Sequence, residues 1–395
     1  MPHITDTDAL VAEGILTAEH ARIIKARSRQ TMIALAINTL LAGGVAAAAL
    51  GLVVLLADAA AVAATGAVFL AVGVAILGRG GAAYRMFGNA AALIGAGMLT
   101  AGATIELIDS YARSASAALL VLGAGIGLSA GAVIRHGPKA MRFAAGAVVL
   151  MGGAMHLAGL YFGLSEAGVM GVLVPFAHFY TAVLVAVVGW LIDVRAVTAL
   201  AIVPFAQMLD TSTFYFHAAY VFYSPEPTLS IVQMAVLVAV CVWVMVRMPD
   251  RIGRHAGILA IMGVIVGNLC FLVGSLWGDV VGLTYWDAAH PYLDGTDWDA
   301  RDAAQDAFAA RTLVISDHVF AVVWAVVLAA AAIWSAHANR RGLFNASITF
   351  GAIHAYTQAF ESFGDEPLAY VIGGLATIPL AWGVWQLNNR FGESA

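Results

Sequence analysis

Several side chains that can carry protons or bind polar solutes fall within or beside long apolar runs of this 395-residue chain. They are Glu106, His156, His178, Asp210, His217, Asp317, His318, His354, Gln358 and Glu361. An ionisable group at the centre of a bilayer costs about 2.5–3.5 kcal/mol on insertion scales, so each needs a partner, a water-filled cavity or a function. Histidine titrates near physiological pH, which suits it to proton relay. The set therefore predicts a polar binding site or a proton pathway.

Two groups of polar side chains recur at helical spacing, which places each group on one face of a helix. Gln207, Asp210, Thr213 and His217 follow one another at spacings of 3, 3 and 4. His354, Gln358 and Glu361 lie at positions i, i+4 and i+7. Asp210 and His354 are the deepest of the set in the expected helices, so contact with water explains them least well.

The elements that must position these groups are membrane spans. Hydrophobic residues make up 62% of the chain and charged residues 11%, against about 45–50% and 25% in soluble domains. Runs near the length needed to cross the hydrocarbon occur at residues 31–57, 59–77, 87–109, 115–134, 143–163, 169–191, 195–217, 228–247, 256–277, 312–335, 343–362 and 367–387. We predict an all-α polytopic transmembrane bundle of about twelve helices.

The distribution of positive charge predicts the orientation of the bundle. Of the 19 lysines and arginines, all but Arg113, Arg301 and Arg311 fall in segments that this topology places on one side. Lys and Arg are enriched in cytoplasmic loops. Both termini are therefore expected in the cytoplasm, and the chain is expected to be a multi-pass protein of a bacterial inner membrane.

This orientation puts the polar side chains in the outer half of the membrane. We therefore expect one polar cavity open to the outer face. Its expected walls are the helices over residues 143–163, 169–191, 195–217, 312–335 and 343–362. Pro175 and Pro204 would free backbone carbonyls to line it.

Three functions fit such a cavity. The favoured one is a proton-linked transporter or permease. The second is a membrane scaffold or assembly subunit with a structural polar interior, in which His156 is a packing residue and Glu106, His217 and Glu361 are solvated at helix ends. The third is a metal-dependent enzyme, with Zn²⁺ held by three of His156, His178, Asp210, His318 and His354. The chain lacks a compact metal motif and a phosphate-binding loop, so no cofactor and no nucleic-acid partner are predicted, and an enzyme is not favoured.

Two segments flank or interrupt the transmembrane domain of residues 31–395. Residues 1–30 predict a cytoplasmic helical hairpin, with Gly14 ending one helix and Thr17 capping the next. Residues 279–311 form an acidic outer loop, in which Asp299 is expected to cap a short helix running to Ala310. Besides the lipid bilayer, a protein partner is expected at one of these two segments.

Small residues recur every fourth position in two expected helices. The two patterns are Gly43-xxx-Ala47-xxx-Gly51 and Gly123-xxx-Gly127-xxx-Gly131. Such spacing lets helix backbones approach closely. It predicts tight packing, either within the chain or between copies in an oligomer.

Two stretches of the chain resemble a bacterial family of predicted membrane proteins of unknown function. The first is Glu13-Gly-Ile-Leu-Thr-Ala-Glu-His-Ala-Arg-Ile-Ile24, and the second is Ile348-Thr-Phe-Gly-Ala-Ile-His-Ala-Tyr-Thr-Gln-Ala-Phe360, followed by Gly373-Gly374. The resemblance implies a short soluble segment before many transmembrane helices, and it transfers no catalytic residue. Residues Asp250 to Arg254 are also similar to a loop motif of the major facilitator superfamily, but the link between the sixth and seventh expected helices is too short for that family.

Overall fold

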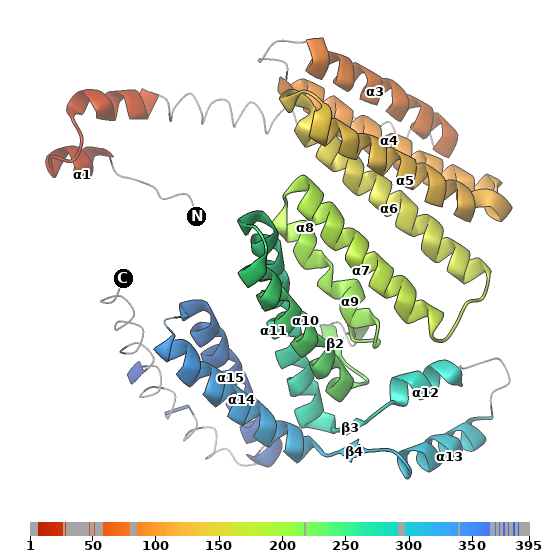
Figure 1. Cartoon of the computed structure of the whole chain (residues 1–395), viewed down its shortest axis with the longest axis vertical. Coiled ribbons are helices and arrows are strands. Elements are labelled where there is room, and N and C mark those ends of the chain that lie inside the picture. The colour runs from red at the N-terminus through yellow and green to blue at the C-terminus, as the bar shows by residue number, and fades with distance from the viewer. Residues whose placement is uncertain are drawn as a thin grey trace. The chain divides into compact units, whose positions relative to one another are not determined.

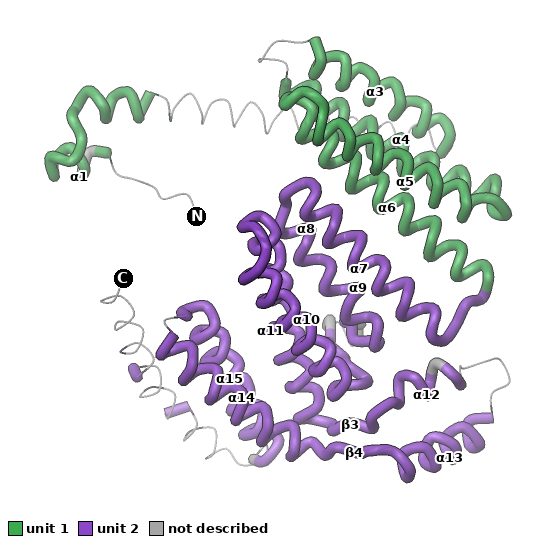
Figure 2. Tube along the Cα trace, viewed as in Figure 1, with its two compact units in different colours: residues 1–167 green, residues 168–395 purple. Residues whose placement is uncertain are grey.

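A computed structural model describes residues 7–26, 28, 58–79, 85–216, 219–290, 297–338 and 340–363, together with a few isolated positions. The expected helices over residues 31–57 and 367–387 lie outside these continuous ranges, as does His217. The chain divides into two compact units, Met1–Ala167 and Gly168–Ala395 (Figure 2). Each unit is described by itself below.

Eight helices of the described part are long and apolar enough to cross a membrane. They are α3 (Ala59–Arg79), α4 (Arg85–Ser110), α5 (Ala112–His136), α6 (Arg142–Glu166), α7 (Leu173–Ile192), α10 (Pro227–Arg247), α11 (Asp250–Trp277) and α14 (Asp317–His337). Each coincides with an expected run. The chain is therefore an all-α, multi-pass membrane protein. Helix α15 (Arg341–Phe363) is as long as these but more polar.

In the first unit, glycines bring pairs of helices into backbone contact. A Cβ atom on Gly73 of α3 would lie 2.4 Å from the backbone nitrogen of Ala92 on α4. One on Gly123 of α5 would lie 2.3 Å from the backbone nitrogen of His156 on α6. The second small-residue pattern of the sequence thus serves packing within the chain at Gly123, because only a hydrogen fits there. The 3-10 turn η2 (Lys139–Met141) joins α5 to α6.

This unit also includes α1 (Thr7–Ala12) and a second helical stretch at residues 18–26. Gly14 between them has φ +75°, a conformation that favours glycine. The Thr17 hydroxyl accepts a hydrogen bond from the backbone nitrogen of His20 at 3.2 Å. The placement of this segment in the cytoplasm stays a prediction.

The helices of the second unit alternate in direction (Figure 1), so that the turns between them lie at two ends. One end, here called the basic end, holds the turns at residues 193–195 and 248–250 and the described residues 338 and 340 between α14 and α15. Arg251 there donates to the backbone carbonyl of Trp190 at 2.6 Å, which joins α11 to α7. The opposite end, here called the acidic end, carries the acidic segment that follows α11. There β3 (Asp279–Val280) pairs antiparallel with β4 (Val314–Ile315).

The expected helix over residues 195–217 is wrong in its second half. The chain is helical in α8 (Arg195–Leu200) and α9 (Ile202–Gln207), and then turns at Asp210, whose φ is +54°. Strand β1 (Ser212–Phe216) follows and pairs antiparallel with β2 (Ala219–Tyr223). Threonine and aromatic residues after Asp210 favour a strand over a helix. Asp210 therefore lies at a helix end, and the stripe of four polar side chains does not form.

The acidic segment folds into a small cap, here called the acidic cap and comprising the described residues 279–290 and 297–315. It contains α12 (Leu283–Ala289) and α13 (Trp298–Ala309). Arg301 is 8% exposed, donates to the Asp287 carboxylate at 2.8 Å and stacks over the Trp286 ring. Asp297, rather than the expected Asp299, caps α13 by accepting from the backbone nitrogen of Ala300. A buried arginine thus holds together a segment whose composition indicates a solvated loop.

Candidate functional site

Two of the sequence-predicted residues lie in the first unit. His156 Nδ1 is 2.8 Å from the carbonyl oxygen of Leu120, a bond that joins α6 to α5. Glu106 is partly exposed near the end of α4. For His156, this geometry matches the packing role considered as the alternative to a ligand.

Asp210 and His178 of the second unit lie close enough for their charges to interact. Partial burial raises the pKa of the Asp210 carboxyl, and His178 opposes that change. The Asp287 carboxylate of the acidic cap adds to the increase in the pKa of Asp210. The charges of side chains on α7, after the end of α9 and on α12 therefore influence one another.

His354 belongs to a different group. Its ring lies 4.8 Å from that of Trp324 on α14, and Trp324 Nε1 donates to Asn268 Oδ1 of α11 at 2.8 Å. His354 Nδ1 and Gln358 Nε2 are buried with no hydrogen-bond partner in the described part of the chain. Helix α11 packs against α8 and α9 on one side and against α14 on the other (Figure 1). The residues expected around one cavity are thus divided between two groups.

The remaining sequence-predicted residues lie at the acidic end. Asp317 begins α14, and its carboxylate is 2.9 Å from His318 Nδ1. The His318 side chain is 89% exposed, and Glu361 near the end of α15 is exposed too. These positions match the solvated helix ends considered in the sequence.

The most completely buried acidic groups are two that the sequence-based reasoning missed. Glu226 immediately precedes α10 and is 0% exposed. Its two carboxylate oxygens accept hydrogen bonds from the backbone nitrogens of Gly282 and Thr284, the second at 3.0 Å. Asp279 follows α11, is 6% exposed, and accepts from the backbone nitrogen of Thr228 at 2.8 Å. Two carboxyls therefore connect the start of α10 to the acidic cap.

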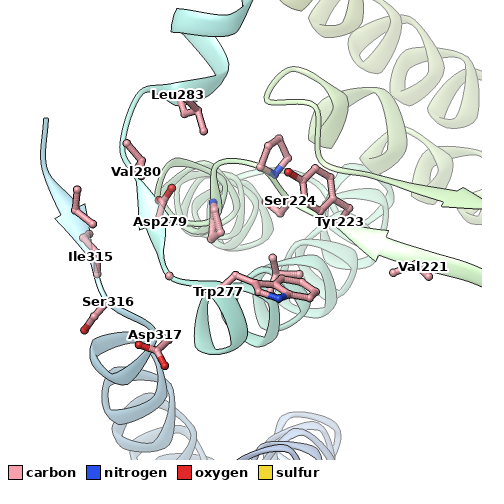
Figure 3. Close-up of a pocket in the computed structure, with 15 residues that line it drawn as sticks. Val221, Tyr223, Ser224, Trp277, Asp279, Val280, Leu283, Ile315, Ser316 and Asp317 are labelled. Carbon is pink, nitrogen blue, oxygen red and sulfur yellow. The ribbon is translucent and has the colours of Figure 1, made fainter. Parts of the chain in front are cut away.

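Asp279 also borders a cavity. Its Oδ1 atom is buried and has no hydrogen-bond partner among the described residues, and Asp279 lines a cavity of about 650 Å³. The cavity lies between strand β2, the start of α10, the end of α11 and the β3–β4 pair. In Figure 3, Tyr223 reaches from the hairpin toward the Asp279 side, whereas Ser316 points away. Most of the remaining wall is apolar, including Trp277, Val273 and Leu283.

Burial changes the acidity of both carboxyls. It raises the pKa of Glu226, against the effect of its two backbone hydrogen bonds, and the nearby Asp279 raises that pKa further. Burial likewise raises the pKa of Asp279 against its bonds to Thr228. Taking an ionised carboxyl out of water disfavours the charged form. The pair is therefore suited to taking up and releasing protons.

Three buried hydroxyls form a hydrogen-bonded group at the base of the β1–β2 hairpin. Thr211 Oγ1 is 2.8 Å from Ser224 Oγ and 2.8 Å from Ser230 Oγ. All three side chains are at most 2% exposed. Because they satisfy one another, they fix where the β1–β2 hairpin leaves the membrane helices.

A second buried network was also missed, at the basic end. The imidazole of His255 is 4% exposed, with Nδ1 2.6 Å from Thr198 Oγ1 and Nε2 3.1 Å from Asp193 Oδ1. The hydrogen bond from His255, followed by the charges of Arg251 and Arg254, lowers the pKa of Asp193. Thr198 is 1% exposed, so no solute reaches its hydroxyl. The network is a connection between α8 and α11 rather than a reactive site.

The missed carboxyls carried a weak signal in the sequence. Glu226 stands between Pro225 and Pro227, directly before an apolar run, and Asp279 follows Gly278 directly after one. Acidic residues at such helix ends are usually solvated, so the sequence pattern does not predict that these two carboxyls are buried. Only the folding of the acidic cap over them removes water.

No three His, Cys, Asp or Glu side chains in the described ranges come together as a metal site. A zinc site built from His156, His178, Asp210, His318 and His354 is thus not supported by the described geometry. The fold and the buried carboxyls define a multi-pass helical membrane protein whose second unit holds, at its acidic end, a mostly apolar cavity bordered by Asp279 and Asp317. No family model matches the chain, and no curated protein or solved structure is detectably similar to it.

Proposed function

We propose that this protein is a proton-linked transporter or permease, and that the cavity beside Asp279 is its solute site. The observation that carries the proposal is that Asp279, which lines a 650 Å³ cavity, has a buried Oδ1 atom with no hydrogen-bond partner among the described residues. A buried carboxyl with a changed pKa at the wall of a cavity is a candidate functional group. A structural carboxyl would have both oxygens satisfied, as Glu226 does.

The shape of the neighbouring helix supports the same function. Residues 195–207 form a short, interrupted apolar helix. At 1.5 Å per residue it spans about 20 Å, less than the hydrocarbon core of about 30 Å. Interrupted helices border the solute sites of many transporters. Here the helix ends at Gln207, and the chain continues through the turn at Asp210 into the hairpin whose strand β2 forms one wall of the cavity.

We further propose that the basic end faces the cytoplasm of a bacterial cell and the acidic end faces outward across the inner membrane. Arg195, Arg247, Arg251 and Arg340 all lie at the turns of the basic end. This arrangement agrees with the enrichment of Lys and Arg in cytoplasmic loops. The cavity would then open on the outer side, and Asp210 and His178 would lie on that side too.

The test uses the full chain in proteoliposomes with a pH gradient and an entrapped pH dye. Amino acids, sugars, organic acids and quaternary ammonium salts are added in turn. We expect at least one class to dissipate the gradient with the wild type and not with Asp279→Asn. The control variant Asp306→Asn removes an exposed carboxyl of α13 and should behave as the wild type. If no solute class changes proton flux relative to Asp279→Asn vesicles, the proposal is wrong.

A scaffold role is the second candidate, favoured by the exposed face of the acidic cap. Asp299, Asp302 and Asp306 are all exposed on α13, on a segment that Arg301 holds in one shape. Such a face suits a basic protein partner. A phenotype lost on replacing these three residues by Asn, and kept in Asp279→Asn, would favour this role.

A further inference from the structure

We infer that the cavity beside Asp279 takes a lipophilic organic cation and exchanges it for a proton. This inference rests on the proposed function and adds the class of solute. It starts from the chemistry of the cavity wall, which combines the carboxyl side chains of Asp279 and Asp317 with aromatic rings and an otherwise mostly apolar lining.

The charged groups of the wall are all acidic. Asp279 and Asp317 line the cavity, and its described lining includes no Lys or Arg. The two arginines of the acidic cap are not among the lining residues: Arg301 is bonded to Asp287 and to the carbonyl of His290, and Arg311 donates to the carbonyl of Ala307. The carboxylates of the wall would therefore repel an anion, and the described lining includes no positive side chain to attract it. A cation is the charge type that fits.

The aromatic residues favour an organic cation over a metal ion. Trp277 and Tyr223 line the cavity from α11 and from the hairpin (Figure 3). Aromatic faces attract cations whose charge is spread over alkyl or aryl groups. A metal ion would need several oxygen ligands, and the described residues offer no cluster of three acidic or histidine side chains. The 650 Å³ volume also lies within the range of small-molecule sites.

The Asp279 carboxyl serves both the proton and the cation. Its Oδ2 atom accepts from the backbone nitrogen of Thr228, so Oδ1, which has no partner among the described residues, is the atom that takes the proton, and the charge of the ionised carboxylate attracts the cation. The titratable groups around it are Glu226 before α10, Tyr223 on β2 and Asp317 at the start of α14. A proton on Oδ1 cancels the charge that attracts the cation. Binding of the cation therefore releases a proton to water, and affinity rises with pH through the raised pKa of Asp279.

The test measures binding, without transport, by equilibrium dialysis of the purified full chain between pH 5 and pH 8. The probe is tetraphenylphosphonium, and tetraphenylborate is the probe of the same shape and opposite charge. We expect the wild type to bind the cation at least about tenfold more tightly than Asp279→Asn does, which corresponds to the loss of one charge interaction. Affinity should rise with pH in the wild type and in Asp306→Asn, and not in Asp279→Asn. Asp306→Asn is the control for general surface charge.

Three results would overturn the inference. The first is that the wild type and Asp279→Asn bind tetraphenylphosphonium equally tightly. The second is that the wild type binds tetraphenylborate as tightly as tetraphenylphosphonium. The third is that Trp277→Leu binds the cation with unchanged affinity, which would contradict the aromatic contact. This variant keeps the test possible if Asp279→Asn does not fold, because Trp277 is 66% exposed and its replacement leaves the core intact. If the inference alone fails, another solute class still dissipates the pH gradient in the proteoliposomes, whereas failure of both removes transport itself.

Discussion

Asp279, the second residue after α11, accepts a hydrogen bond from the backbone nitrogen of Thr228, the second residue of α10, at 2.8 Å. One carboxylate oxygen thus caps a neighbouring helix, whose first amide groups lack partners within the helix. The other oxygen is buried without a hydrogen-bond partner among the described residues, on a side chain that lines the cavity. The structural and proposed functional roles of Asp279 therefore belong to different atoms of one side chain.

This division predicts that two substitutions of Asp279 behave differently. Asn retains an oxygen that can accept from Thr228, so Asp279→Asn should keep most of the stability while losing proton exchange. Ala removes the cap, which costs about 0.5–2 kcal/mol. Thermal unfolding in detergent measures the first effect, and proteoliposome flux measures the second. Equal stability of Asp279→Ala and the wild type would show that the cap contributes nothing.

The buried Glu226 predicts a particular pH dependence of stability. Its folded-state pKa is raised by burial, so the folded state binds this proton more tightly than the unfolded state does. Its contribution to stability is full below the ordinary carboxyl pKa of about 4 and is lost as pH rises through the folded-state pKa. Glu226→Gln should flatten this part of the curve of melting temperature against pH. Asp306→Asn, with an exposed carboxyl, should leave the curve unchanged.

The network at the basic end predicts a cost for removing one hydroxyl. Thr198→Val preserves shape but leaves His255 Nδ1 without its partner at 2.6 Å. An unsatisfied buried polar atom costs about 1–3 kcal/mol. Thr100→Val is the matched control, since the Thr100 hydroxyl bonds only carbonyls of its own helix. A loss of unfolding free energy no larger than that of the control would contradict the proposed connection of α8 to α11.

Acidification should weaken the same network. The His255 hydrogen bond lowers the pKa of Asp193, so the stability that Asp193 provides is present above its ordinary pKa and is lost as pH falls through the lower, folded-state value. Asp193→Asn should reduce the sensitivity of the melting temperature to acid. A melting curve with the same acid limb as the wild type would show that Asp193 is not the group concerned.

The glycine contacts of the first unit predict a difference between two neighbouring positions. A Cβ on Gly123 would lie 2.3 Å from a backbone atom of α6, whereas one on Gly125 would meet nothing within 4 Å. Gly123→Leu should therefore separate α5 from α6 and cost at least about 1–3 kcal/mol, the usual effect of overpacking. Gly125→Leu should be nearly neutral. Melting temperatures of the two variants in the same detergent decide the matter, and equal values would refute the contact.

The sequence alone determined the class of this protein and the places of its helices. All eight helices of the described residues that can span a membrane coincide with apolar runs in the sequence, because covering the backbone in lipid requires long helices of apolar side chains. The β1–β2 hairpin was not predictable in the same way. The run over residues 195–217 is apolar throughout, and what stops its helix is the left-handed turn at Asp210.

Only the tertiary structure decided which polar side chains meet. Spacing along one helix predicts which residues share a face, but it does not predict which other helices this face contacts. Asp210 and His354 therefore belong to separate groups on the two sides of α11, although the sequence suggested a common cavity. Glu226 and Asp279, 53 positions apart by their numbers, become buried neighbours because the acidic cap covers them. Burial arises from what packs over a residue, and no local pattern records it.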